Sequence, residues 1–345
     1  MKSIIFICEG DELSQSTSHR CYMVANELVE NGYSIKILPN SHIMRKEMHN
    51  IIQQFKNWVM ILKENPDIVV IHRVANLIDY HMIKFAKKSK IIFDYDDALF
   101  HIRYPGRILS YSHLNKILEM SDAVSAGSHY LLEFAKQFNK NVFLIPTPVD
   151  MEMFHPVENK KRNNNQIVIG WLGSGTKYQL RYLRLLKDPL KKLVQKYDIK
   201  FKIISALAKE VRDEFAYLGS KVDFGLDHWV PLEEIPMIVS DFDIGVMPLT
   251  DEPFARGKCA MKALEYMAMG IPVVASAVGE NKYVIENGQN GFLVYSPEDW
   301  IRYLEKLILD RNLREKIGKN GRRIVEEKYS VKVVADKIID IIEEI

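Results

Sequence analysis

The chain has 345 residues, of which 47% are hydrophobic and 27% are charged, and its formal net charge at pH 7 is +2. This length is long for one domain and suits two domains of about 150 residues each. Because the charges nearly cancel, no strong overall field draws the chain toward nucleic acid, and we expect no nucleic-acid partner.

The cysteines and the N-terminus favour a reducing environment. Cys8, Cys21 and Cys259 are odd in number, far apart and never part of a CxxC pair, so neither a zinc site nor a disulfide framework is indicated. The apolar run that ends at Cys8 is too short for a signal peptide, and no stretch approaches the roughly 18 apolar residues of a membrane span. We therefore expect a cytoplasmic protein.

Short apolar runs alternate with longer amphipathic ones through the first half of the chain, which is typical of βαβ units around a parallel sheet. The expected strands are Ser3–Cys8, Ser34–Leu38, Ile68–Ile71, Ile91–Phe93, Ala123–Ser125 and Val142–Ile145. The expected helices include Arg20–Glu30, Ile43–Lys63 and His129–Phe138.

The amphipathic segment near residues 43–64 has two interpretations. Its apolar positions, among them Phe55 and Trp58, are interspersed with Lys56 and Lys63. A helix with this pattern can rest on an anionic bilayer, which would give peripheral contact with the inner face of the membrane. Packing against the sheet explains the same periodicity, and we favour it.

Prolines and a polar run mark the middle of the chain. Pro146, Pro148 and Pro156 interrupt helix formation, and the run Glu158–Asn165 contains nothing to bury. We therefore place an N-terminal domain at residues 1–150 and a linker at residues 151–165.

The alternation begins again after the linker. The expected strands are Ile167–Trp171, Lys200–Ile204, Ile244–Met247, Pro272–Ala275 and Phe292–Val294. The expected helices are Tyr178–Lys196, Cys259–Met269, Glu298–Leu309 and Val331–Glu344. A C-terminal domain at residues 166–330 is followed by a helix at residues 331–345, which we expect to pack back toward the N-terminal domain.

The predicted fold class is α/β, with two doubly wound, Rossmann-like domains that face a central cleft. Ligands of open α/β sheets bind at the carboxyl ends of the strands. Residues that directly follow strands are therefore the candidates for a functional site.

A turn of small residues follows the first strand of the C-terminal domain, at Gly170–Lys177. Glycines let the backbone approach a ligand closely, and the N–H groups at a helix start attract phosphate. The spacing matches neither GxGxxG nor a P-loop, so an ordinary tight turn is the alternative.

The segment Asp243–Ser276 carries basic residues at an unusual place. A helix is expected to start near Lys258, so that Arg256 and Lys258 lie at its N-terminus, where the helix dipole disfavours cations. A bound diphosphate would explain this pair, and a solvated charge pair is the alternative. Glu265, further along the helix, could accept hydrogen bonds from a ribose diol or be a rim residue.

Several segments together resemble a known family. They are FDIGVMPL, PFARGKCAMKALEYMAMGIPVVAS and the GQNGFLV run in the second half, and FDYDDALF, SDAVSAGSHYL and VFLIPTPVD in the first. The chain is similar over nearly its whole length to family 4 glycosyltransferases of the GT-B fold. It resembles the subgroup with RGKxxxKxLxYMAxGxPVVAS in place of the familiar E-x7-E signature.

The resemblance implies roles on the donor side. Glu265 corresponds to the second Glu of the E-x7-E signature and would hold the donor ribose, while the first Glu falls at Gly257. Backbone amides of Phe254, Ala255 and Gly257 would then contact the sugar hydroxyls. The family's diphosphate-neutralising pair is half present, because Lys177 matches the Lys while Trp171 occupies the Arg position. Arg256 and Lys258 would supply the missing charge beside Gly173 and Ser174.

The resemblance also implies roles in the first domain. Asp96 would take the place of a His that faces the donor sugar. Asp94 and Asp96 form a DxD, which in the GT-A glycosyltransferase fold chelates a metal; here we favour a role facing the sugar or acceptor, and a helix cap is the other alternative. Arg20, Arg73 and Asp97 are expected to line the acceptor side of the cleft.

These correspondences imply a retaining, metal-independent, hexosyltransferase-like glycosyltransferase without a cofactor. The partners would be a nucleotide-diphosphate-sugar donor, with its base near Asp227–Val230, and a polysaccharide or lipid-linked glycan acceptor. Two alternatives are an epimerase or phosphorylase of the same fold and a non-catalytic subunit that binds nucleotide-sugar. The missing first Glu keeps the last alternative open.

Overall fold

The computed structural model describes residues 1–40, 47–86, 88–102, 111–157, 166–205, 208–226, 228 and 230–345, with only the backbone described at 47–49. The chain forms two compact units. Unit 1 comprises Met1–Asp150, Arg256–Cys259 and Tyr329–Ile345, and unit 2 comprises Met151–Ala255 and Ala260–Lys328. Arg256–Cys259 therefore differs from our expected boundaries, because its contacts group it with unit 1 rather than with the second half of the chain.

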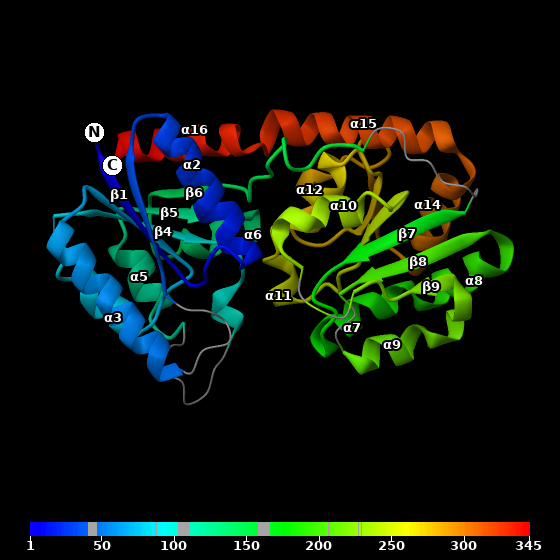
Figure 1. The fold of residues 1–345 in the computed structure, drawn as a ribbon, viewed down its shortest axis with the longest axis horizontal. Coiled ribbons are helices and arrows are strands. Elements are labelled where there is room, and N and C mark those ends of the chain that lie inside the picture. The colour runs from blue at the N-terminus through cyan, green and yellow to red at the C-terminus, as the bar shows by residue number, and fades with distance from the viewer. Residues whose placement is uncertain are drawn as a thin grey trace. The chain divides into compact units, whose positions relative to one another are not determined.

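Unit 1 is built on a parallel six-stranded sheet in the order β2-β1-β3-β4-β5-β6 (Figure 1). The strands are β1 (Ser3–Cys8), β2 (Ser34–Pro39), β3 (Ile68–His72), β4 (Lys90–Tyr95), β5 (Ala123–Ala126) and β6 (Val142–Leu144). Each contains the run expected from the sequence except β6, which ends one residue earlier. Nearly every residue of β3 and β4 is buried, because helices cover both faces of a doubly wound sheet.

Helices connect these strands. They are α1 (Gln15–Thr17), the π-helix η1 (Ser18–Met23), α2 (Val24–Glu30), α3 (Glu47–Glu64), α4 (Leu77–Ile83), the 3-10 helix η2 (Leu99–His101), α5 (Leu114–Met120) and α6 (His129–Ala135). The helix expected over Arg20–Glu30 thus begins earlier, at Gln15, and its Ser18–Met23 part is π-helical. The wider turn of a π-helix is frequent at functional sites.

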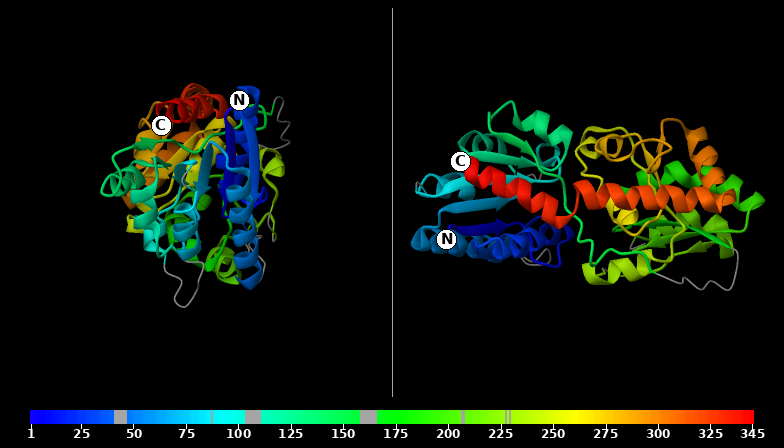
Figure 2. Two further views of the ribbon diagram at one scale, coloured as in Figure 1. Left: turned by 90° about the vertical axis from the view of Figure 1, so that its left-hand side faces the viewer. Right: turned by 90° about the horizontal axis from the view of Figure 1, so that it is seen from above.

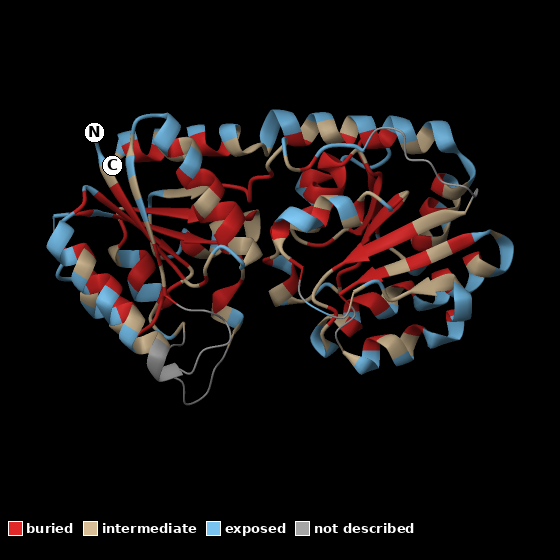
Figure 3. Cartoon of the chain, in the orientation of Figure 1, coloured by how far each residue is buried: buried red, intermediate tan, exposed pale blue. Residues whose placement is uncertain are grey.

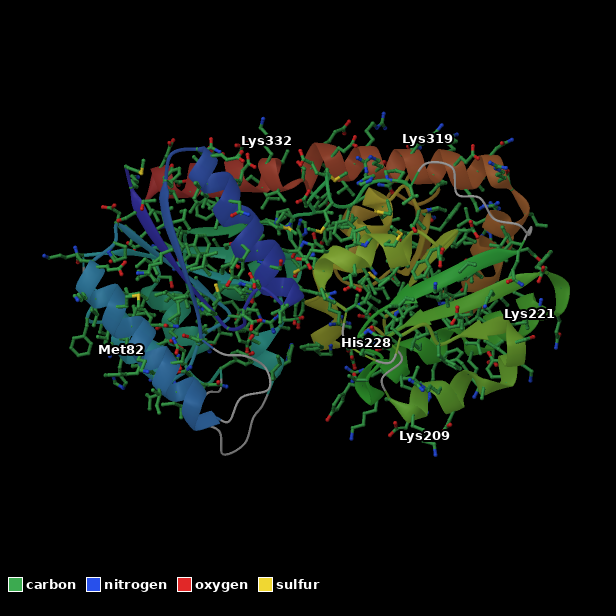
Figure 4. The ribbon with its side chains drawn as sticks, in the orientation of Figure 1. Met82, Lys209, Lys221, His228, Lys319 and Lys332 are labelled. Atoms are coloured by element: carbon green, nitrogen blue, oxygen red, sulfur yellow. The ribbon has the colours of Figure 1, made fainter. Side chains whose placement is uncertain are left out.

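The C-terminal helix α16 (Val331–Glu344) completes the core of unit 1. Val334, Ile341 and Ile342 are at most 2% exposed and share a cluster with Phe6 and Leu28 from β1 and α2. Both views of Figure 2 show α16 on the same unit as the N-terminus, and the labelled Lys332 projects from its outer side in Figure 4.

The outer face of α3 differs from our expectation of simple packing. Trp58 is fully buried, as packing predicts, but so are the amides Gln54 and Asn57, at 1% and 2% exposed. Phe55 and Val59 are instead exposed, at 54% and 47%. Figure 3 shows both buried and exposed stretches along α3. The buried amides are satisfied because Asn57 donates to the Pro39 carbonyl and Gln54 donates to Asp79. The expected Ile43 lies outside the described residues.

Unit 2 contains a second parallel six-stranded sheet, in the order β12-β11-β10-β7-β8-β9. Its strands are β7 (Ile167–Leu172), β8 (Ile199–Ile204), β9 (Val222–Asp223), β10 (Ile244–Met247), β11 (Val273–Ser276) and β12 (Phe292–Val294). The short edge strand β9 was not predicted. Two doubly wound sheets confirm the expected α/β class.

The helices of unit 2 include one long helix that the sequence pattern did not predict. They are α7 (Lys177–Leu183), η3 (Arg184–Leu186), α8 (Lys187–Lys196), α9 (Lys209–Phe215), η4 (Ala216–Lys221), η5 (Leu232–Glu234), α10 (Ile235–Val239), α12 (Met261–Ala268), α13 (Asn281–Val284), α14 (Pro297–Leu309) and α15 (Arg311–Lys328). α15 has few apolar residues, and it packs on α12, where Gly321 lies against Met267. Its buried residues are Ile317, Gly318, Gly321 and Val325.

Gly318 is packed so tightly that helix propensity and packing oppose each other. A Cβ added there would lie 1.9 Å from the Gly270 carbonyl oxygen. Although alanine is favoured over glycine in a helix by about 1 kcal/mol, we expect Gly318→Ala to destabilise the protein by about 1–3 kcal/mol through overpacking. Urea unfolding measures this change.

The matched control is Lys319→Ala on the same helix, whose side chain is exposed and projects outward (Figure 4). Its effect should stay within about 0.5 kcal/mol. If Gly318→Ala stabilised the protein, the close approach of α15 to the end of α12 would be wrong.

Candidate functional site

The carboxyl edge of the unit 1 sheet gathers polar residues from three adjacent strands. Strand order reverses between β1 and β3, and such a switch point is where open α/β sheets bind ligands. Glu9 follows β1, Arg73 follows β3, and Asp96 and Asp97 follow β4. Backbone hydrogen bonds from Glu9 to the His72 carbonyl and from Arg73 to the Asp94 carbonyl hold these segments side by side.

A buried ion pair lies beneath this edge. The Arg20 guanidinium, from η1, donates to both carboxylate oxygens of Asp94, with Nε 2.9 Å from Oδ2, and Ser125 donates to the same carboxylate. Burial by itself would raise the pKa of Asp94, but the Arg20 charge and hydrogen bonds from His72 and Arg20 hold that pKa well below its usual value. Arg20 is 4% exposed. It therefore supports the edge from below rather than lining a cleft as expected.

His72 and Ser16 connect Asp94 to Asp96. The His72 Nδ1 lies 2.7 Å from Asp94 Oδ2, and its Nε2 lies 3.1 Å from Ser16 Oγ. Ser16 in turn donates to Asp96 Oδ2 at 2.6 Å. Neither residue was among the site residues predicted from the sequence. The position of His72 at the end of β3, beside the DxD strand, was the signal that could have found it.

Arg73 holds three carboxylates together. Its guanidinium lies 2.9 Å from Glu9, 3.3 Å from Asp96 and 3.5 Å from Asp97. Burial would lower the pKa of Arg73, but these three charges raise it well above its usual value. The backbone of Arg73 is left-handed, with φ 61°, a strained conformation that is common at functional sites.

The segment Arg256–Cys259 adds a second group of contacts to unit 1. Lys258 Nζ lies 3.9 Å from Asp97 Oδ1, and the Cys259 thiol donates to the Asp96 carbonyl at 3.1 Å. Ser128 donates to the Gly257 carbonyl, and a Cβ on Gly257 would lie 2.7 Å from the Ala98 Cβ. The missing first Glu of the signature therefore has a steric cause, because a side chain at position 257 has no space.

The helix expected over Cys259–Met269 is shorter than predicted, and a separate short helix precedes it. A four-residue helix, α11 (Pro253–Arg256), ends at Arg256, and α12 begins only at Met261 after Ala260 in a left-handed conformation, φ 56°. Arg256 thus lies in the last turn of α11, where the dipole favours a cation. Our expectation that Arg256 and Lys258 oppose a helix dipole was wrong, so that argument for a bound diphosphate no longer applies.

In unit 2, the equivalent edge follows β7. Gly173 must be glycine, because the Trp171 ring folds over it and a Cβ would lie 2.3 Å from that ring. Trp171 itself is 3% exposed and belongs to the hydrophobic core, so it does not replace an Arg that faces a ligand. Ser174 is half-buried, and Lys177 is exposed as the first residue of α7.

α12 brings two charged residues toward this core. Glu265 is 1% exposed, so it is not a rim residue. Lys262, one turn earlier, lies with Nζ 5.9 Å from the centre of the Trp171 ring. Lys262 was not among the predicted site residues. It lies three residues before Glu265, so the two side chains are neighbours on the surface of one helix. The neighbouring Tyr266 hydroxyl accepts a hydrogen bond from the Leu172 amide at 2.7 Å.

The remaining candidate residues differ in how far they are exposed. Phe254 is half-buried, Ala255 is buried, and His228 is exposed, while Asp227 and Trp229 of the expected base site lie outside the described residues. Within the described parts of the chain, no group of three or more His, Cys, Asp or Glu residues could hold a metal ion.

Solved structures of the same architecture define the fold. Sucrose-phosphate synthase from Thermosynechococcus elongatus matches with a TM-score of 0.76 at 15% identity, covering 100% of this chain and 99% of that one. A glycosyltransferase from Rickettsia africae matches at 0.74 and 19%, covering 99% and 98%. Anabaena HepE in complex with UDP and glucose matches at 0.71 and 15%, covering 100% of both. The predicted GT-B fold is confirmed.

Sequence relatives identify the family. The family described as "Glycosyl transferases group 1" matches residues 152–324, half of the chain. The capsular polysaccharide biosynthesis glycosyltransferase CapM of Staphylococcus aureus is 28% identical over 51% of this chain and 45% of its own length. Spore coat protein SA of Bacillus subtilis is 31% identical over 33% of this chain and 30% of its own. The chain thus spans less than half the length of these two relatives. It belongs to the group 1 glycosyltransferases.

The Arg20–Asp94 pair generates a stability prediction. Asp94→Asn leaves a buried guanidinium without its counter-charge, so it should lower the free energy of unfolding by about 3–5 kcal/mol at pH 7. Because folding lowers the pKa of Asp94 from the ordinary value of 3.8, this contribution is complete above that value and is lost as the pH falls through the folded-state pKa. Urea unfolding at pH 7 and in steps below pH 4 measures both effects.

Lys90→Ala provides the control, because it removes a pair with Asp122 in which the lysine is half exposed. That change should cost less than about 1 kcal/mol. The buried pair would not stabilise unit 1 if both substitutions lowered the free energy of unfolding equally. The same conclusion would follow if the loss caused by Asp94→Asn did not become smaller below pH 4.

Proposed function

We propose that this protein transfers a sugar from a nucleotide-diphosphate-sugar to an acceptor, with retention of the anomeric configuration and without a metal ion. Glu265 carries the proposal. Its carboxylate is 1% exposed within α12, the helix whose Tyr266 hydroxyl accepts a hydrogen bond from the Leu172 amide at the end of β7. Glu265 also lies within the segment that matches the family, and the resemblance to family 4 glycosyltransferases implies that it would hold the donor ribose.

The donor would bind at the carboxyl edge of the unit 2 sheet. Gly173 and Ser174 follow β7, and Lys177 supplies a cation nearby. We add Lys262 to this set. Trp171 lies in the core at the position where the family has an Arg, and the Lys262 ammonium lies 5.9 Å from the centre of the Trp171 ring. Structures of Anabaena HepE in complex with UDP, with UDP-glucose, and with UDP and glucose support a nucleotide-sugar donor.

The chemistry would be mainly electrostatic. Cations and backbone amides, including those of Phe254, Ala255 and Gly257, stabilise the negative charge that develops on the leaving diphosphate. A phosphate oxygen of the leaving group takes the proton from the acceptor hydroxyl. Arg256 and Lys258 stay in this proposal as cations for the diphosphate, with Asp96 and Asp97 oriented toward sugar or acceptor hydroxyls.

We propose a glycan acceptor, either a polysaccharide or a lipid-linked glycan, on the cytoplasmic side. The similarity to a capsular polysaccharide glycosyltransferase supports this class. Over the described residues, none of the helices combines the length and apolar character that crossing a bilayer needs. The outward face of α3 supports a peripheral contact instead, because exposed Phe55 and Val59 lie beside exposed Lys56 and Lys63.

Glu265→Gln tests the ribose role with little change in shape. Hydrogen bonds to a charged group contribute about 1.5–3 kcal/mol, so affinity for the nucleoside diphosphate should fall by about 10-fold or more. Isothermal titration calorimetry with UDP, ADP and GDP measures it, with Glu305→Gln on α14, which pairs with Lys196, as the control. Undiminished affinity in Glu265→Gln, or no binding of any diphosphate by the unaltered protein, would contradict the proposal.

Replacing Phe55 and Val59 with serine tests the membrane contact. Each buried apolar side chain contributes about 1.5–3 kcal/mol, so sedimentation with phosphatidylglycerol vesicles should weaken at least about 10-fold, while phosphatidylcholine vesicles bind weakly throughout. Leu309→Ser, at a position at the end of α14 that is still more exposed, should leave binding unchanged. If the unaltered protein ignores anionic vesicles, the outward face of α3 has another partner.

A further inference from the structure

The hydrogen bonds around His72 determine where its protons lie. Ser16 Oγ is 2.6 Å from Asp96 Oδ2, and a carboxylate can only accept, so the single hydroxyl proton of Ser16 points to Asp96. Ser16 therefore has no proton left for His72, and the His72 Nε2, at 3.1 Å, must donate to it. On the other side of the ring, Nδ1 donates to the Asp94 carboxylate at 2.7 Å. Both ring nitrogens carry a proton.

The ionisation of both aspartates supports this assignment. Burial would raise the pKa of Asp96, but the charges of Arg73, His72 and Arg20 and the hydrogen bond from Ser16 lower it. The pKa of Asp94 is lowered as well, by Arg20 and by hydrogen bonds that outweigh the effect of burial. Two carboxylates thus remain acceptors on either side of one imidazole.

The charges of the cluster lead to the same result. The groups that face this edge include four carboxylates and three permanent cations. The carboxylates are Glu9, Asp94, Asp96 and Asp97, and the cations are Arg20, Arg73 and Lys258. Tyr111 donates a hydrogen bond to Glu9, and Cys8 lies beside His72 in the β1–β3 register. Neither residue adds a charge to the cluster. A protonated His72 makes the cluster neutral, which favours its burial.

We propose that His72 is a buried imidazolium and that, together with Ser16, it is a positioning residue that orients the Asp96 carboxylate. Asp94 fixes the ring, the ring fixes the Ser16 oxygen, and the Ser16 proton fixes Asp96 Oδ2, while Arg73 lies 3.3 Å from Oδ1. Asp96 is then a rigid, ionised hydrogen-bond acceptor. Its use on a sugar or acceptor hydroxyl rests on the proposed glycosyltransferase function.

The same geometry rules out a different use of these residues. Ser16, His72 and Asp94 occur in the arrangement of a hydrolytic Ser–His–Asp triad. In a triad the neutral imidazole accepts the serine proton, whereas here that proton is already donated to Asp96. Ser16 is therefore not activated as a nucleophile, and Asp96, with a lowered pKa, is a hydrogen-bond acceptor rather than a general base.

The protonation of His72 can be tested without any substrate. Two-bond ¹H–¹⁵N correlation spectra of ¹⁵N-histidine distinguish an imidazolium from each neutral tautomer. At pH 8, we expect the His72 ring to show two protonated nitrogens, because Nδ1 faces the Asp94 carboxylate and Nε2 faces a Ser16 oxygen whose proton is given to Asp96. His72→Gln assigns the signal, and if that variant does not fold, the slow exchange expected of a fully buried ring N–H identifies it.

Asp96→Asn and Asp97→Asn form a matched pair for this measurement. Asp97 faces the same arginine as Asp96, whereas the Ser16 hydroxyl donates to Asp96. Without the Asp96 charge, Ser16 can donate to Nε2, so Asp96→Asn should remove the Nε2 proton signal and leave the Nδ1 signal. Asp97→Asn should leave both signals.

Ser16→Ala removes the acceptor of the Nε2 proton and should therefore also remove the Nε2 proton signal. A neutral His72 in the unaltered protein at pH 8, or equal effects of Asp96→Asn and Asp97→Asn, would overturn the proposal. Neither outcome depends on whether the protein transfers a sugar. The proposed function is tested separately, by the binding of nucleoside diphosphates.

Discussion

The buried pair of Arg20 and Asp94 is the interaction on which the edge of the unit 1 sheet depends. Asp94 accepts hydrogen bonds from Arg20, His72 and Ser125. Arg20 lies in a π-helix, and the other two lie on β3 and β5, the strands on either side of β4. Three elements that are distant in the sequence are thus held at one carboxylate. A charge can be buried only when it is paired and fully hydrogen-bonded, so these residues must come together for the unit to fold. The same contacts hold Asp96 in place through His72 and Ser16, and Asp96 in turn pairs with Arg73.

The second unit reaches a comparable edge by different means. There, steric contacts rather than ion pairs set the backbone: the Trp171 ring lies over Gly173, and Tyr266 ties α12 to the end of β7 through the Leu172 amide. The two edges therefore respond differently to change. Acid weakens the ionic edge of unit 1, whereas altered side-chain volume disturbs the packed edge of unit 2.

The strands and the fold class could be read from the sequence because both sheets are buried on two faces and leave continuous apolar runs between helical segments. α15 could not, because glycine contacts take the place of an apolar stripe and leave a charged, weakly periodic sequence. The break between α11 and α12 was also hidden, since it depends on Ala260 in a conformation that alanine rarely adopts.

At the site, motif positions identified Asp96, Arg73 and Glu265 as candidates, and the structure shows where each lies. Motifs could not reveal Ser16 and His72, because their role comes from contacts between segments separated by 56 residues. Arg20 shows the opposite limit: its place after the first strand suggested contact with ligand, but the π-helix turns its side chain inward toward Asp94.

The route of the chain has a practical consequence for dissecting the protein. The segment Tyr329–Ile345 returns to unit 1, where Val149 and Ser330 form a β-bridge and α16 covers apolar residues of β1 and α2. A fragment that stops at Asp150 would lack this cover and expose part of its hydrophobic core to water. Residues 1–150 are thus a poor choice for separate expression. Since both termini belong to the same unit, joining them by a short peptide and opening the chain at a loop of unit 2 offers a better route to rearranged versions.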